Sequence, residues 1–215
     1  PNAEIYASAG AGVNELRAHF GIEATPVKTG DTLCIGERTL SFVTTPMVHW
    51  PDNMVTYSDV DKILFSNDAF GQHFATTKRF DDENDMCEVM KQAKKYYANI
   101  VWPYGMQAGR ALAAVKGLEL KMIAPSHVAL HIDEIIAKYE EWTTYQTQEK
   151  AVVVFDSMWH STESMAREIC DAFIAEGISA QLIDVKSTHI SDIMLYMCDA
   201  KYVAVGSPTL NSNML

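Results

Sequence analysis

The sequence lacks the features of a membrane, secreted or nucleic-acid-binding protein. No apolar run approaches the ~18–20 residues that a membrane-spanning helix needs. The first residues, Pro1 to Glu4, do not show the basic segment and apolar run of a signal peptide. The formal net charge of −11 argues against nucleic acid and against anionic membrane surfaces as partners. We therefore expect a cytoplasmic protein that binds neither nucleic acid nor membrane.

Cysteine pairs and glycine-rich motifs are also missing. The four cysteines (Cys34, Cys87, Cys170 and Cys198) include no Cys-x-x-Cys pair, so there is neither a zinc-ribbon spacing nor the pattern of a disulfide framework. We expect reduced thiols, as is usual in the cytoplasm. The sequence contains no Gly-x-Gly-x-x-Gly and no Gly-Lys-Ser/Thr, which excludes the dinucleotide fingerprint and the P-loop.

The composition that remains is that of a globular protein with room for two domains. Hydrophobic residues make up 48% and charged residues 21% of the 215 positions. Residues 143–150 are polar and show no periodicity, which is typical of a linker between domains. We therefore expect one domain over residues 1–145 and a second over residues 151–215.

The two predicted domains differ in their pattern of elements. In the first, the alternating runs 31–36 and 39–45 predict a β-hairpin, and apolar residues at helical spacing predict a helix over 83–99. These features favour a sheet with antiparallel portions. In the second, strands predicted at 151–155, 179–185 and 202–206 alternate with helices, which predicts a parallel β-α-β-α-β sheet. The fold class is therefore α/β.

Three side chains in the first domain form a candidate metal site. Asp68 follows the buried strand Ile63-Leu64-Phe65, His49 ends the strand-like run 40–49, and His127 follows the run 120–126. Imidazole and carboxylate ligands held at strand ends suit a first-row transition metal. Taken singly, a His or Asp at a strand end is more often a turn former or a solvated residue.

The second domain has a candidate phosphate site between its first strand and helix. Ser157, Ser161 and Thr162 lie at the predicted start of a helix, where free N–H groups and the helix dipole favour a phosphate. An ordinary helix N-cap is the simpler explanation for these hydroxyls when they are considered alone. A second small polar loop, 206–211, follows the third strand, and ligands of open α/β sheets bind at these strand ends.

Both constellations resemble segments of one known family. His49-Trp50-Pro51-Asp52-Asn53-Met54 and Ser66-Asn67-Asp68-Ala69-Phe70-Gly71-Gln72-His73 resemble segments of the flavodiiron proteins, also called A-type flavoproteins. The loops 156–163 and 206–211 resemble the two FMN-contacting loops of the flavodoxin domain in that family. The resemblance runs along essentially the whole chain. It implies the C-terminal part of a metallo-β-lactamase-like αββα domain, followed by the first β-α-β-α-β of a flavodoxin-like doubly wound sheet.

The resemblance also implies an activity, cofactors and partners. Flavodiiron proteins pass electrons from FMN to a non-haem di-iron centre, which reduces dioxygen to water or nitric oxide to nitrous oxide. By resemblance, His49 and His127 are iron ligands and Asp68 bridges the two iron ions. No catalytic residue is implied beyond these ligands. A rubredoxin-like electron donor and a head-to-tail homodimer or tetramer are likewise implied by the family. The residues implied for FMN binding are Ser157, Met158, Trp159, His160, Ser161, Thr162, Ser207, Pro208, Thr209, Leu210 and Asn211.

The sequence departs from the family pattern at several points. The family takes its other iron ligands from a His-x-Glu-x-Asp-His motif, which this sequence does not contain. Val128 follows the last His where Gly is usual, His131 stands in place of Trp, and His160 stands in place of Gly. We therefore expect a piece of a flavodiiron protein, truncated at both ends and inactive on its own in that reaction.

Three other functions are compatible with the same residues. The first is a zinc hydrolase of the metallo-β-lactamase superfamily, in which a metal-bound hydroxide is the nucleophile. The second is an FMN electron-transfer module on a metal-free scaffold. The third is a structural dimerisation scaffold, which would bind neither FMN nor iron.

Overall fold

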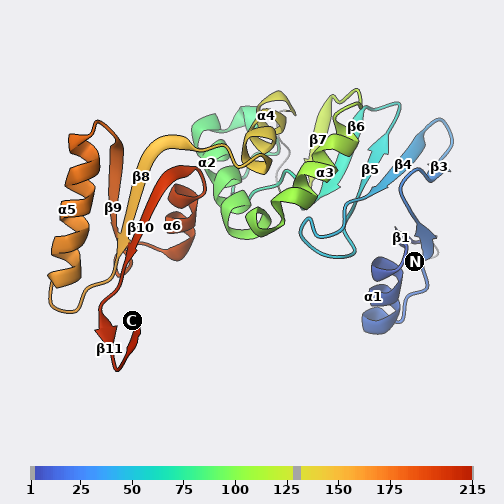
Figure 1. Ribbon diagram of the computed structural model, residues 1–215. Coiled ribbons are helices and arrows are strands. Elements are labelled where there is room, and N and C mark those ends of the chain that lie inside the picture. The colour runs from blue at the N-terminus through green and yellow to red at the C-terminus, as the bar shows by residue number, and fades with distance from the viewer. Residues whose placement is uncertain (1–2, 128–131, 215) are drawn as a thin grey trace. The chain divides into compact units, whose positions relative to one another are not determined.

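The computed structural model describes residues 3–127 and 132–214. The chain divides into two compact units, Pro1–Thr144 and Tyr145–Leu215, and each is considered by itself. Among the described residues, none of the helices is both long enough and apolar enough to cross a membrane. Figure 1 shows the helices and strands, coloured from blue at the N-terminus to red at the C-terminus.

A five-stranded sheet forms the centre of the first unit. Its order is β3-β4-β5-β6-β7, with antiparallel pairing up to β6 and a parallel pair between β6 and β7. The predicted hairpin is therefore present as β3 and β4. The strands are β3 (Thr32–Cys34), β4 (Thr39–Thr44), β5 (Met54–Ser58), β6 (Ile63–Asn67) and β7 (Met122–Pro125).

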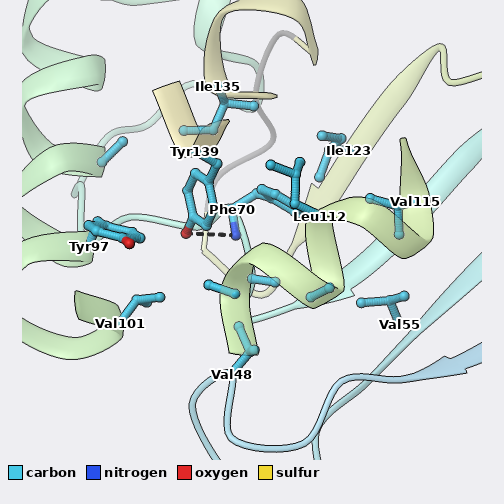
Figure 2. Packing of buried hydrophobic residues seen from close by; sticks show 14 of the residues in the cluster. Val48, Val55, Phe70, Tyr97, Val101, Leu112, Val115, Ile123, Ile135 and Tyr139 are labelled. Atoms are coloured by element: carbon cyan, nitrogen blue, oxygen red, sulfur yellow. Dashed lines mark hydrogen bonds between the residues drawn. The ribbon is translucent and has the colours of Figure 1, made fainter. Parts of the chain in front are cut away.

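The core of this unit lies between the sheet and its helices. Val55, Leu64 and Ile123 are buried on neighbouring strands and pack in one cluster with residues of three helices (Figure 2). On β6 the pattern alternates, because Leu64 is fully buried while Phe65 on the other face is 48% exposed. The three helices are α2 (Met86–Tyr96), α3 (Gly105–Val115) and α4 (Ile132–Thr143).

Shorter elements complete the first unit. The parallel pair β1 (Tyr6–Ser8) and β2 (Thr25–Val27) is connected through helix α1 (Ala11–Phe20). A π-helical turn, η2 (Tyr97–Val101), continues α2, and 3-10 turns occur at η1 (Asp81–Glu83) and η3 (Trp102–Tyr104). Tyr96 and Tyr97, which lie where α2 meets η2, are both buried.

The second unit is a parallel sheet with helices on both faces. Its strands are β8 (Gln148–Phe155), β9 (Ser179–Asp184) and β10 (Ala200–Gly206), in the order β10-β8-β9. Alternate residues of β8 enter different clusters: Val152 and Val154 pack with residues of α6 (Ile190–Met197), and Val153 and Phe155 with residues of α5 (Ser161–Ala175). This explains why β8 is apolar at every position from Ala151 to Phe155. The short antiparallel pair β11 (Thr209–Leu210) and β12 (Asn213–Met214) follows β10.

One predicted strand is too long. The run 40–49 was expected to be a single strand that ends at His49, but β4 ends at Thr44. From Thr45 the chain turns, and the Met47 and Val48 N–H groups donate to the carbonyls of Trp50 and Thr45. His49 therefore lies in a loop between β4 and β5, because Pro46 and the local turn bonds end the sheet pairing.

Candidate functional site

The three predicted metal ligands lie close together at one end of the five-stranded sheet. His49 Nε2 lies 3.5 Å from Asp68 Oδ2, and His127 Nε2 lies 3.8 Å from Asp68 Oδ1. The side chains of His49 and Asp68 are about one quarter exposed, and that of His127 is 41% exposed. The imidazoles thus face different oxygens of one carboxylate.

A chain of polar side chains joins the three loops that carry these residues. The Asn53 side chain donates to Thr45 Oγ1 (2.7 Å), and the Asn67 side chain donates to Asn53 Oδ1 (2.6 Å). Ser126 Oγ donates to Asn67 Oδ1 (3.1 Å), while the Ser126 N–H donates to the Asn67 carbonyl (2.7 Å). We call Thr45, Asn53, Asn67 and Ser126 the polar chain. Its members flank His49, Asp68 and His127 in sequence. The polar chain therefore holds the backbone positions from which these three side chains extend.

A buried residue of the core forms a hydrogen bond with the turn that follows Asp68. Phe70, in the left-handed region at φ 65°, donates its N–H to the Tyr139 hydroxyl at 3.1 Å (Figure 2). Gly71 lies so close to the neighbouring loop that an added Cβ would be 3.3 Å from the Asp68 carbonyl and 3.6 Å from His127 Cβ. A side chain at position 71 would therefore crowd the Asp68 carbonyl and require a small shift of the turn.

Two further rings border the candidate ligands. The ring of His73 lies edge-on to two other rings. The distance between ring centroids is 5.0 Å to His127 and 4.9 Å to Tyr96. Burial, and next the neighbouring His127, lower the pKa of His73. Burial also raises the pKa of Tyr96, whose hydroxyl has no hydrogen-bond partner among the described residues. Both pKa shifts favour the neutral forms of His73 and Tyr96.

The donor set can be tested against the metals that the family resemblance implies. Among the described residues, no three His, Cys, Asp or Glu side chains form a group that could hold one metal ion. Asp68 instead forms two separate pairs, one with each imidazole. His49, Asp68 and His127 are the residues that would hold metal ions here, and further ligands would have to come from other groups. Val128 and His131 lie outside the described residues.

The predicted phosphate loops also meet, at the carboxyl end of the second unit's sheet. The Asp156 N–H donates to the Gly206 carbonyl at 2.9 Å, which connects the loop after β8 with the loop after β10. Ser157 and Thr162 are buried, whereas Ser161 is exposed and Trp159 is 83% exposed. Of the second loop, Thr209 and Leu210 form β11, and Ser207 Oγ donates to the Pro208 carbonyl.

An unsatisfied hydroxyl supports a ligand at these loops. Ser157 Oγ is buried and has no hydrogen-bond partner among the described residues. A buried hydroxyl without a partner is costly, and a phosphate oxygen would accept its hydrogen bond. His160, at φ 64°, precedes α5 without a side-chain cap bond to that helix, and its ring instead lies 2.8 Å from Glu163 Oε2. The residues present therefore fit a phosphate group.

The sequence predicted the ligands and loops but not the groups that support them. Asn53, Asn67, Ser126 and Tyr139 carried no separate signal, although Asn67 and Ser126 directly precede predicted ligands. The one local sign in the sequence is an Asn directly before a candidate ligand, because Asn adopts the left-handed conformation more readily than most residues; Asn67 does so at φ 55°.

Comparison with known protein families matches two successive parts of the chain. Residues 2–128 match the family described as ODP family beta lactamase, and residues 153–215 match the flavodoxin family. The predicted α/β fold class, a β-lactamase-like part followed by a partial flavodoxin domain, is therefore confirmed.

Similar proteins have been named for reactions of nitric oxide and oxygen. A nitric oxide reductase of Moorella thermoacetica is 39% identical over 100% of this chain and 56% of its own length. A rubredoxin-oxygen oxidoreductase of Megalodesulfovibrio gigas is 39% identical over 95% of this chain and 53% of its own length. The chain thus spans about half the length of these curated relatives.

The fold comparison leads to the same group of proteins. The crystal structure of the flavodiiron protein from Giardia intestinalis matches with a TM-score of 0.93 and 37% identity, over 100% of this chain and 54% of that one. The chain is thus a homologue of the flavodiiron proteins and belongs to the family described as ODP family beta lactamase.

Proposed function

We propose that this chain works in a flavodiiron oxidoreductase that reduces dioxygen to water or nitric oxide to nitrous oxide. His49, Asp68 and His127 would hold two non-haem iron ions, and the loops 157–162 and 207–211 would hold FMN. The observation that carries the proposal is the placement of Asp68 between two imidazoles, each of which faces its own carboxylate oxygen. The names of the relatives support the substrates and a rubredoxin as donor.

The chain's own residues would contribute positioning and charge. Asp68 would place a negative charge between two cations, and the polar chain and Tyr139 would keep its turn from moving. Neutral imidazoles at His49 and His127 would donate Nε2 lone pairs. In the second unit, Ser157 Oγ and the start of α5 would bind the flavin phosphate. FMN, when bound, supplies electrons singly to a centre that needs several.

The other implied properties belong to the same proposal. We expect a head-to-tail homodimer or tetramer, because the family passes electrons between the flavin of one subunit and the metal centre of another. We also propose domains over residues 1–145 and 151–215. The four free thiols support a cytoplasmic location.

The first test is cofactor binding by this chain within a full-length flavodiiron protein, which supplies the remaining iron ligands. Anaerobic reconstitution with FMN and Fe(II), followed by desalting, should give flavin absorption bands and protein-bound iron. Asp68→Asn should release the iron and retain the flavin, while His19→Ala, at an exposed His of α1, should retain both. Nitric oxide and oxygen consumption by the reconstituted protein is then measured with reduced rubredoxin as donor.

A second candidate function is an FMN electron carrier on a metal-free scaffold. It is favoured by the finding that no three potential ligands form one metal-binding group among the described residues. Flavin without iron in the reconstitution would support the carrier and contradict the reductase. Zinc without flavin would instead indicate a hydrolase.

A further inference from the structure

Lys186 connects the turn after β9 to the first phosphate loop. Its Nζ donates to the Ser157 carbonyl and lies 3.1 Å from Asp156 Oδ1. Lys186 belongs to neither of the loops that resemble the FMN-contacting loops, which are 156–163 and 206–211. A role for Lys186 therefore has to be argued from these contacts.

The backbone that carries Lys186 is itself well fixed. The Val185 N–H donates to the Phe155 carbonyl at 3.1 Å, which continues the pairing of β9 with β8. The Lys186 N–H donates to Asp184 Oδ1 at 2.9 Å, and the Ser187 N–H donates to the Asp184 carbonyl. Since this turn is already ordered, only the lysine side chain loses freedom when the contact with the loop forms.

The contact fixes the orientation of one peptide group. In a planar trans peptide the carbonyl and the following N–H point in opposite directions. Holding the Ser157 carbonyl on the Lys186 side therefore directs the Met158 N–H away from Lys186. The loop is thus kept in one of two peptide orientations before any ligand binds.

The contact also balances a charge that would oppose phosphate binding. Asp156 precedes the buried Ser157 and accepts the Ser157 N–H at 2.6 Å. A carboxylate beside a phosphate site raises the energy of the bound anion through like-charge repulsion. The Lys186 ammonium next to Asp156 Oδ1 offsets this repulsion.

We propose that Lys186 is a positioning residue for the flavin phosphate, which orders the Ser157–Met158 peptide and neutralises Asp156. This inference rests on the proposed binding of FMN at these loops. It predicts an effect on flavins that carry a phosphate and little effect on those that do not.

The test compares FMN with riboflavin, which has the same ring and no phosphate. Each flavin is titrated into the flavin-free 215-residue chain and its fluorescence is followed. Lys186→Met should weaken FMN binding about tenfold, the size expected for one charged hydrogen bond, and leave riboflavin binding nearly unchanged. Lys186→Arg should restore most of the FMN affinity.

A matched control is available at the opposite end of the same sheet. Lys201, near the start of β10, pairs with Glu149 at 2.6 Å and is exposed. Lys201→Met removes the same charge from the same unit and should leave the affinities for FMN and riboflavin unchanged. Equal weakening of both flavins by Lys186→Met, or no weakening of either, would overturn the role of Lys186.

A measurement on the flavin-free chain separates the proposed role of Lys186 from the proposed binding of FMN. Amide hydrogen exchange over residues 157–162 of the flavin-free chain should be faster in Lys186→Met than in the wild type and in Lys201→Met. If the wild type binds no FMN, the flavin assignment itself fails. If the wild type binds FMN and exchange in this loop is the same in Lys186→Met, only the role of Lys186 is contradicted.

Discussion

The two candidate sites are built in different ways. At the first, three loops far apart in sequence are joined by side chains, from Thr45 through Asn53 and Asn67 to Ser126. At the second, the ends of two adjacent parallel strands are joined by one backbone hydrogen bond, from Asp156 to Gly206. The first site thus depends on the identity of supporting side chains, and the second mainly on the path of the backbone.

This difference decides which substitutions each site should tolerate. A site held by side-chain hydrogen bonds should be sensitive to changes that touch no ligand at all, because the buried members Thr45 and Asn53 then lose partners. A site held by the backbone should respond most to residues that change the allowed φ and ψ angles. Four substitutions test this contrast, in order of decreasing expected effect.

The largest effect is expected for Tyr139→Ala. Tyr139 is 1% exposed, and its ring lies 4.7 Å from that of Phe70 and 5.3 Å from that of Tyr97. Truncation of a buried aromatic residue costs about 3–5 kcal/mol. Calorimetry should show a much lower transition temperature for the first unit than in the wild type. A transition temperature equal to that of the wild type would contradict this role of Tyr139.

Tyr139→Phe serves as the matched control for that variant. It keeps the ring and removes only the hydroxyl, which leaves the buried Phe70 N–H without its partner. The free energy of unfolding should fall by about 1–3 kcal/mol, less than for Tyr139→Ala.

The second effect concerns the polar chain. Asn67→Gly removes the amide and keeps the left-handed backbone accessible, since Asn67 has φ 55°. Loss of the Asn67 donor leaves the buried Asn53 Oδ1 without that partner, which should lower the stability of the first unit by about 1–3 kcal/mol. Binding of Fe(II) should weaken by at least about tenfold, as is usual when a group that orients metal ligands is lost.

Lys62→Gly is the control for the polar chain, because Lys62 has a similar φ of 58° in the same unit. It should leave Fe(II) affinity unchanged. Equal metal affinities in the two variants would show that the polar chain does not position the ligands.

The third effect should be stabilising. His160 occupies the left-handed region at φ 64°, where a side chain is strained and glycine is not. His160→Gly should raise the stability of the second unit by up to about 1 kcal/mol, reduced by the greater freedom of glycine in the unfolded chain. Thermal unfolding followed by circular dichroism measures the change. Glu163→Gln, which removes the charge that faces both the His160 ring and Arg167, should not reproduce it.

The smallest effect lies at a surface ion pair of the first unit. Bidentate hydrogen bonds from Arg38, followed by one from Ser58, lower the pKa of Asp61 from 3.8 to about 2. A lowered carboxyl pKa stabilises the folded state above the unfolded pKa, and this stabilisation disappears as the pH falls through the folded pKa. Asp61→Asn should therefore lower the melting temperature at pH 7 by no more than about 2 °C. A difference that persists below pH 2 would contradict this origin.

The same contrast explains how much was predictable from the sequence. The strands of the second unit were predicted closely, because β8 packs on both faces and reads as an uninterrupted apolar run. The loops after β8 and β10 lie at the carboxyl ends of parallel strands, so it was also predictable that these two loops would be close together. His49 was misplaced because its loop contains Val48, which is buried in the core although it lies outside any strand. A buried loop residue and a strand residue look alike in a hydrophobicity pattern.

The support of the first site was not predictable because it depends on pairs distant in sequence. Tyr139 reads only as one apolar position of a helix, and nothing local indicates that its hydroxyl accepts from Phe70. Asn53 and Asn67 read as turn residues, which they also are. Their partnership appears only when β5 and β6 are placed side by side in the sheet.

The hydrogen bonds of the polar chain all have the same polarity. Ser126 donates to Asn67, Asn67 to Asn53, and Asn53 to Thr45. Rotation of one amide by 180° would set two donors or two acceptors against each other at the Asn53–Asn67 contact, whereas the Thr45 and Ser126 hydroxyls can donate or accept. The two amides therefore reverse together or not at all, which makes the chain a cooperative unit. A disturbance of any one loop would thus reach the other two without movement of the strands.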